Sequence, residues 1–126
     1  MKLSLGACAL VALSMLTAAS ARAAPAVSTA DVNMRTGPGV EFPSVGVIPE
    51  GAPVDVQGCL NDESWCDVIW EGNRGWVFGE YLGFEYNGAT ALLPDVGLSV
   101  FGIPAIVFNA REYWDRYYVG RPWYRE

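Results

Sequence analysis

Residues 32–39 read VNMRTGPG, and residues 75–82 read GWVFGEYL. The first stretch starts as an alternating strand and ends in a glycine–proline–glycine turn, because glycine accepts positive φ and proline presets a turn. Between the two stretches, short apolar runs and turn residues recur about every 8 to 12 residues, which is the rhythm of a small barrel or sandwich. This pattern decides the fold class and predicts a small all-β domain.

Five strands and one helical turn are predicted in this region. The strands cover residues 32–35, 45–48, 53–56, 65–70 and 75–77, and residues 79–82 form the helical turn that closes the barrel. Alternate side chains of a strand point to the same side. We therefore expect Cys66, Val68 and Trp70 to share one face of the fourth strand.

The first 23 residues have the pattern of a secretory signal peptide. Lys2 supplies the positive charge, an apolar stretch follows, and cleavage is predicted after Ala23, with Ala21 as the alternative. The apolar stretch is shorter than the roughly 18 to 20 residues of a membrane span, which disfavours an uncleaved anchor. We expect export to the periplasm or cell envelope, without stable membrane insertion after signal cleavage, and we interpret residues 24–28 as a small-residue linker.

Two cysteines, Cys59 and Cys66, remain in the 103 residues that follow this cleavage site. An even number of cysteines in an exported chain favours a disulfide. The pair flanks a polar hairpin tip at residues 61–64, so the two side chains can meet across an antiparallel ladder. Closing this eight-residue loop would contribute about 2.5 kcal/mol.

The charge balance excludes some classes of partner. The 103 residues contain 14 acidic residues and 6 arginines, which gives a net charge of −8. Such a surface repels phosphate groups, so it argues against nucleic acid or anionic lipid as the main partner.

The residue types needed for common catalytic sites are missing from the sequence. The chain has no histidine, which removes Ser-His-Asp and Cys-His machinery and ordinary histidine zinc sites. Carboxylates such as Glu50, Asp55 and Glu71 fall on turns and outward strand positions, and residues 61–63 offer too few ligands for calcium. We therefore expect no enzymatic activity, no catalytic residue, no cofactor and no metal site.

The ordered set of motifs resembles the bacterial SH3 domain, a small five-stranded barrel common in bacterial envelope proteins. The motifs are the strand and turn at 32–39, a proline-x-glycine turn at 49–51, Trp65 at the start of the fourth strand, and glycine-tryptophan-valine at 75–77. The resemblance implies an all-β, five-stranded SH3-like barrel at residues 28–84. A C-terminal extension at 85–126, ending in a short helix, would follow it.

The resemblance also implies a binding role, either for cell-wall peptide or for an envelope protein. Ligand contacts are expected in a groove between the first long loop and the hairpin tip, at Arg35, Phe42, Trp65, Trp76 and Tyr81. These positions also have structural alternatives. A core role is favoured for Trp76, whereas Trp65 and Phe42 adjoin polar loops and fit either role. Arg35 can form a surface ion pair, which would contribute little. The leading prediction is a non-catalytic binding module of the periplasm or cell envelope.

The extension carries its own signals. Strand-like pieces are predicted at 99–101 and 105–108 between prolines, and Asn109 with Glu112 forms a capping box for a helix at 110–118. Gly120 can terminate that helix. Charge changes as well, because residues 111–126 hold 4 arginines and 3 acids, whereas residues 24–110 hold 2 arginines and 11 acids.

Half of the residues in the segment 113–124 are aromatic. Two interpretations of this segment stay open. The rings can pack back onto the barrel and enlarge its core. Alternatively, Tyr113, Trp114, Tyr117 and Trp123 can form an exposed stacking surface for sugar rings or a partner protein. The second interpretation gives the alternative function, an interaction or structural role centred on the tail.

Overall fold

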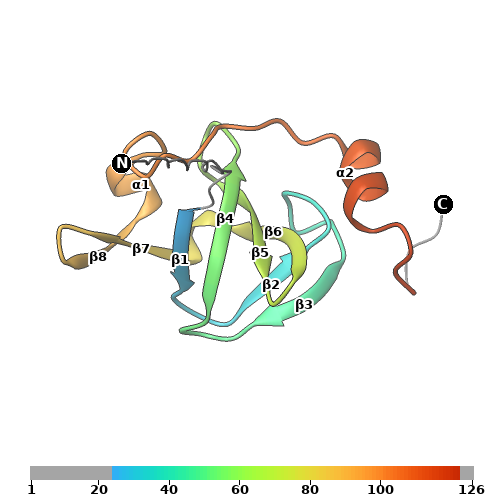
Figure 1. The fold of residues 1–126 in the computed structure, drawn as a ribbon, viewed down its shortest axis with the longest axis horizontal. Helices are drawn as coiled ribbons and strands as arrows, with labels where there is room; N and C mark the ends of the chain where they lie inside the picture. Colours follow the sequence, from blue (N-terminus) through green and yellow to red (C-terminus); the bar gives the residue numbers. More distant parts are fainter. Residues whose placement is uncertain (1–23, 123–126) are drawn as a thin grey trace, which may run out of the picture.

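The computed structural model describes residues 24–122, so the predicted signal peptide (1–23) and Trp123 lie outside the described residues. Figure 1 shows the elements along the chain. They are β1 (Ala24–Ser28), β2 (Val32–Arg35), β3 (Ser44–Ile48), β4 (Pro53–Cys59), β5 (Trp65–Trp70), β6 (Asn73–Phe78), the 3-10 turn η2 (Gly79–Tyr81), β7 (Leu82–Tyr86), β8 (Ala89–Leu92), α1 (Leu93–Val96) and α2 (Ala110–Tyr117).

The eight strands form one antiparallel sheet in the order β3-β2-β6-β5-β4-β1-β7-β8. All five predicted strands are present, as β2 to β6, and the predicted helical turn is η2. The all-β, SH3-like fold class is therefore confirmed. Two details differ from the expected five-stranded barrel: three further strands join the sheet, and the sheet is not closed as a barrel.

The linker interpretation of residues 24–28 is wrong, because these residues form β1. Ala24, Ala26 and Ser28 are buried and the residues between them are exposed. β1 pairs with β4 on one side and β7 on the other, so its backbone groups are satisfied from two neighbours. Strand formation depends more on such pairing than on intrinsic preference, which is why a run of small residues gave no strand signal.

The sheet also continues past residue 84. β7 and β8 form a hairpin with Asn87 and Gly88 as its two-residue turn, both at positive φ (53° and 83°), as the tight hairpin turn requires. Figure 1 shows this hairpin projecting at the end of the sheet opposite α2. Strands β1, β7 and β8 thus enlarge the sheet beyond the region that carries the sequence motifs.

The two strand-like pieces predicted in the extension are not strands. Phe101 lies in a turn, where its N–H donates to the carbonyl of Leu98, and its ring stacks on Phe84 at a centroid distance of 4.5 Å. In the second piece, Ala105 makes only an isolated parallel bridge with Cys59. Phe101, Ile106 and Phe108 are partly buried against the two hydrophobic clusters, whereas Val100 and Val107 are exposed.

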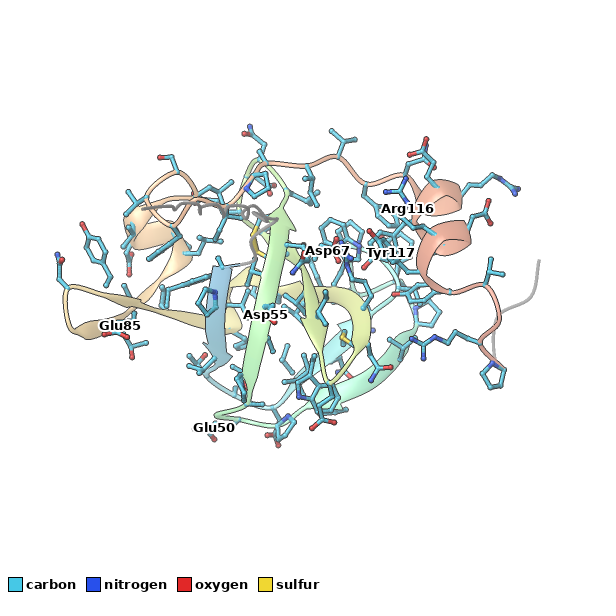
Figure 2. All side chains as sticks on the ribbon, in the orientation of Figure 1. Glu50, Asp55, Asp67, Glu85, Arg116 and Tyr117 are labelled. Atoms are coloured by element: carbon cyan, nitrogen blue, oxygen red, sulfur yellow. A yellow bond between two sulfur atoms is a disulfide. The ribbon has the colours of Figure 1, made fainter. Side chains whose placement is uncertain are left out.

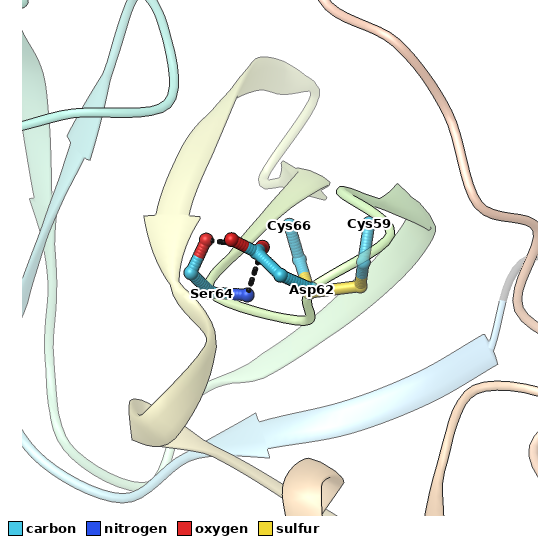
Figure 3. The surroundings of a disulfide bond; sticks show 4 residues. All are labelled: Cys59, Asp62, Ser64 and Cys66. Atoms are coloured by element: carbon cyan, nitrogen blue, oxygen red, sulfur yellow. Dashed lines mark hydrogen bonds between the residues drawn. A yellow bond between two sulfur atoms is a disulfide. The ribbon is translucent and has the colours of Figure 1, made fainter.

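The predicted Cys59–Cys66 disulfide is confirmed and joins the ends of β4 and β5. Figure 3 shows the bridge beside the hairpin tip, where the carboxylate of Asp62 accepts hydrogen bonds from the N–H and the hydroxyl of Ser64 (3.0 and 2.6 Å). Both cysteines are fully buried and belong to the main hydrophobic core. The bridge therefore fixes the hairpin at the core rather than at the surface.

The extension crosses the sheet before it reaches α2. At the disulfide, Cys59 donates its N–H to the carbonyl of Pro104 (3.0 Å) and accepts a hydrogen bond from the N–H of Ile106 (2.8 Å). Figure 1 shows the chain then running to α2 at the far end of the molecule. The predicted helix start is confirmed, because Asn109 Oδ1 accepts a hydrogen bond from the N–H of Glu112 (3.0 Å). Within residues 24–122, no helix is long and apolar enough to cross a membrane.

Candidate ligand-binding surface

One face of the β5–β6 pair points away from the main core. Trp65 is paired with Phe78, and Asp67 is paired with Trp76. Because successive side chains of a strand alternate between faces, these four residues and Arg74 share the outward face, while the side chains between them enter the main core. We call Trp65, Asp67, Arg74, Trp76 and Phe78 the outer strip.

An open groove of about 410 Å³ lies at one end of the outer strip. Its walls come from β2, the following loop, β5, β6 and η2, and consist of Asp31, Val32, Asn33, Arg35, Val40, Trp65, Phe78 and Tyr81. The Trp65 and Phe78 rings meet edge to face at 5.5 Å, and the Phe78 and Tyr81 rings at 5.7 Å. Three adjoining aromatic rings therefore form one side of the groove.

Arg35 supports the opposite wall of the groove. Its Nη1 atom donates to the carbonyls of Val40 (3.3 Å) and Phe42 (2.9 Å). These bonds hold the loop between β2 and β3 in place, so Arg35 is a positioning residue as well as a wall residue. Asp31, also in the wall, accepts a hydrogen bond from the N–H of Glu50 (2.8 Å). The groove thus combines an aromatic side with one cation and one anion that are already oriented.

The other end of the outer strip is covered by α2. Arg74 donates from Nε and Nη2 to the two oxygens of Asp67 (2.9 and 2.8 Å), and the hydroxyl of Tyr113 donates to Asp67 Oδ1 (2.6 Å). The Arg74 guanidinium lies 3.9 Å from the centre of the Tyr117 ring. Figure 2 shows Asp67 and Tyr117 where α2 meets the sheet. Asp67 is only 3% exposed, and its charge is balanced by a bidentate arginine.

Two tyrosine hydroxyls take part in this buried network. Burial raises the pKa of Tyr113 above its ordinary value, and the neighbouring negative charge of Asp67 raises it further. Burial likewise raises the pKa of Tyr118, whose hydroxyl donates to the carbonyl of Arg74 (2.9 Å). Both phenols are therefore neutral hydrogen-bond donors, which suits the acceptors on the sheet.

Aromatic packing completes the cover. The Phe108 ring contacts Trp76 at 5.4 Å and Phe42 at 5.5 Å, both edge to face. Trp76, Tyr113 and Tyr118 form a second buried cluster, separate from the main core. The indole N–H of Trp114 donates to the carbonyl of Thr36 (2.9 Å). Of the two interpretations of the tail, packing onto the domain is confirmed for the described residues.

The predicted ligand residues are thus divided between two places. Arg35, Trp65 and Tyr81 meet in the open groove. Phe42 and Trp76 lie under the tail, and Trp76 is only 1% exposed. Among the predicted tail residues, Tyr113 is buried and Trp114 and Tyr117 are half-buried.

Two polar atoms under the tail lack a partner. Trp76 Nε1 and Thr36 Oγ1 are buried and form no hydrogen bond with any residue that the structure describes. Leaving a buried donor unpaired costs about 1–3 kcal/mol. The tail forms hydrogen bonds with other groups of this surface but leaves these two atoms unpaired.

Sequence reasoning missed Phe78, Asp67 and Arg74 as members of this surface. Phe78 follows Trp76 by two positions, so strand alternation alone could have placed both rings on one face. The signal for the ion pair was weaker: Asp67 is an acid inside an apolar strand, and the position of its partner depends on the β5–β6 register.

In residues 24–122 no group of three or more histidine, cysteine or acidic residues is arranged to hold a metal ion.

Comparison with known protein families agrees with this architecture. The family model of the bacterial SH3 domain matches residues 30–83, which include β2 to β6, η2 and the groove-lining residues. No curated protein and no solved structure shows significant similarity to the chain. Domains of this family generally serve as binding modules. Residues 30–83 of this chain are therefore a bacterial SH3 domain.

Proposed function

We propose that this protein is an exported, non-catalytic binding module of the cell envelope. In this proposal it recognises cell-wall peptide or an envelope protein through the groove at the open end of the outer strip. The observation that carries the proposal is the row of rings formed by Trp65, Phe78 and Tyr81 beside Arg35. Tyr81 is exposed, and Trp65 and Phe78 are half-buried. Accessible aromatic rings next to an arginine provide apolar contact area and hydrogen-bond donors, the combination that binding hot spots favour.

The disulfide supports the proposed compartment. Disulfides persist in oxidising environments such as the bacterial periplasm and are rare in the cytosol. The Cys59–Cys66 bridge of this chain is part of the main core. The predicted signal peptide also indicates export to the periplasm or cell envelope.

Two tyrosines of nearly equal exposure allow a matched test. Tyr81 in the groove is 41% exposed, and Tyr86 on the β7–β8 hairpin is 40% exposed. Each makes an edge-to-face contact with one phenylalanine, Tyr81 with Phe78 and Tyr86 with Phe101. Substitution of either residue by alanine should therefore affect folding similarly, whereas only Tyr81 contributes to the groove.

The experiment is co-sedimentation of the purified protein with purified peptidoglycan. Retention of Tyr81→Ala and Trp65→Ala should fall by about tenfold or more, as expected for loss of a hot-spot residue, and Tyr86→Ala should be retained like the unmodified protein. Equal retention of all four proteins would exclude this groove as the cell-wall site. If none of the four proteins is retained, binding to the cell wall is excluded. The same variants would then be compared in affinity purification from envelope extracts.

The tail-centred alternative is less well supported. Tyr113 is buried, and the rings of Trp114 and Tyr117 contact the sheet or its loops through Thr36 and Arg74. Rings that are engaged in this way do not provide a free stacking platform. The groove is therefore the preferred ligand site.

A further inference from the structure

The open and covered ends of the outer strip form one continuous surface. Trp65 and Phe78 face the groove, and the next outward pair, Asp67 and Trp76, lies under the tail. Neighbouring outward pairs of a sheet are separated by about 7 Å along the strands. An extended peptide that enters the groove and follows the strip would therefore meet the tail after about two residues.

The cover is attached separately from the rest of the fold. The main core contains no residue beyond Ile103. Among residues 106–121, every backbone–backbone hydrogen bond except that from Ile106 to Cys59 lies within the segment. Val107, at the connection to α2, is 93% exposed. The tail can thus leave the sheet without disrupting strand pairing or the main core.

The helix itself has little independent stability. α2 contains only eight residues, and isolated helices shorter than about 12 to 15 residues are marginal in water. Its order therefore depends on docking through Tyr113, Trp114 and Tyr118. A segment held in this way belongs to the low-stability end of a protein, from which moving elements are drawn.

The fit between the cover and the strip is incomplete. Trp76 Nε1 and Thr36 Oγ1 are buried and have no hydrogen-bond partner among the described residues. Trp76 packs against Tyr113 and Tyr118 of the tail, and the Thr36 carbonyl accepts a hydrogen bond from Trp114. Both atoms can donate a hydrogen bond, and peptide carbonyls are suitable acceptors. An extended peptide on this surface could satisfy both atoms, which the tail does not do.

We propose that residues 106–121 are a displaceable cover, and that the outer strip binds an extended peptide along its whole length only when this cover is displaced. The inference rests on the proposed function of the groove. In the closed form the ligand reaches only Trp65, Phe78 and Tyr81. In the open form it also contacts Trp76 and Phe42. The apparent affinity for the whole strip is then the affinity of the open form multiplied by the fraction of molecules that are open.

Opening is measured first in the full chain without ligand. Hydrogen exchange of the α2 amides, such as Tyr118 N–H bonded to Trp114, is compared with exchange of the paired β5–β6 amides. If the cover opens, the α2 amides should exchange at least tenfold faster than the β5–β6 amides. Exchange in α2 should increase by about a further tenfold in Tyr113→Phe, because this substitution removes one hydrogen bond to a charged group. Equal exchange rates in α2 and β5–β6 would show that the tail opens only on global unfolding, and would overturn the proposal.

Binding is then measured with the cover locked. Arg121 Nη1 lies 3.3 Å from Asn73 Oδ1, away from the groove. An Asn73→Cys, Arg121→Cys double variant is cross-linked with a short bismaleimide, and Asn73→Cys carrying a monofunctional maleimide is the matched control. The locked protein should be retained on purified peptidoglycan at least tenfold less than the control, and Tyr113→Phe should be retained more than the unmodified protein. Unchanged exchange of the β5–β6 amides verifies that each variant is folded.

The outcomes separate this inference from the proposed function. Equal retention of the locked and control proteins would overturn the cover and leave the groove as the binding site. If no variant is retained, including Tyr113→Phe, cell-wall binding itself is wrong and the inference falls with it. Reduced retention of the locked protein, together with fast α2 exchange, supports the cover.

Discussion

The hydroxyl of Tyr113 lies 2.6 Å from Oδ1 of Asp67, although the two residues are 46 positions apart in the chain. This contact joins the C-terminal helix to the middle of β5. It is also the third hydrogen bond to a carboxylate that Arg74 already holds through two. The ionised carboxylate of Asp67 therefore organises both the sheet surface and the tail that covers it.

Replacement of Asp67 by asparagine should lower the free energy of unfolding by about 2–3 kcal/mol. Removing one member of a buried ion pair leaves the other charge uncompensated, and the moderate exposure of Arg74, 19% for its side chain, limits the cost. Urea denaturation measures the change. Asp55→Asn on neighbouring β4, where the side chain is exposed, is the control and should change stability by less than about 0.5 kcal/mol. Equal effects of the two substitutions would contradict the assigned role.

Alkaline pH should lower the free energy of unfolding through Tyr113. Because the pKa of Tyr113 is raised in the folded chain, folding retains a proton that the unfolded chain loses. The stabilisation is complete below the ordinary tyrosine pKa of 10.0 and decreases as pH rises above it. Stability should decline by about 1.4 kcal/mol per pH unit for this tyrosine. Phenolate absorbance and urea denaturation across this range measure the effect.

The variant Tyr113→Phe provides the control for this pH dependence. It removes the phenol but keeps the ring that contacts Trp76. Its stability should decline less steeply above pH 10.0 than that of the unmodified protein. A slope that is identical in the two proteins would exclude Tyr113 as the titrating group.

Loss of the disulfide should destabilise the domain by about 2.5 kcal/mol, because the open eight-residue loop gives the unfolded chain more conformational freedom. The double variant Cys59→Ala, Cys66→Ala is compared with the oxidised protein by urea denaturation. Reductant should leave the stability of the variant unchanged and lower that of the unmodified protein. A variant as stable as the oxidised protein would mean that the bridge contributes nothing.

The hairpin tip should show a smaller, local titration effect. The pKa of Asp62 is lowered mainly by the hydrogen bond from the Ser64 hydroxyl, with a further contribution from the Ser64 N–H. Ser64→Ala should therefore raise the pKa of Asp62 towards its ordinary value of 3.8. Because the folded-state pKa is lowered, this contact stabilises the fold above that value and is lost as pH falls below it. Carboxyl NMR titration measures the pKa, and Ser44→Ala, on a serine bonded to Asn33, should leave it unchanged.

Local patterns explain why β2 to β6 were predictable. Apolar and polar residues alternate in β2 and β4, turn residues bound the five strands, and the single-turn η2 follows the glycine-tryptophan-valine motif. The Asn109 cap was visible for the same reason, since it depends on residues three positions apart. Strand β1 was not predictable in this way. Its small residues form a strand because β4 and β7 pair with it.

The candidate site was only partly predictable from the sequence. Five positions were selected from the family resemblance, and three of them meet in the groove. The sequence favoured a core role for Trp76, which its burial confirms, but it did not show that the tail buries this residue, because Trp76 and Trp65 both lie on outward strand positions. Similarly, the pairing of Asp67 with Arg74 depends on how β5 and β6 are aligned.

The sequence by itself determined the all-β class, the SH3 motifs, the disulfide pair and the start of the tail helix, because each depends on residues that are close along the chain. Only the tertiary structure decided that the aromatic tail docks on the β5–β6 face and that Asp67 is buried beneath it. Contacts between distant segments depend on the path of the whole chain, and here the strand register and the crossing at Cys59 bring the tail to that face.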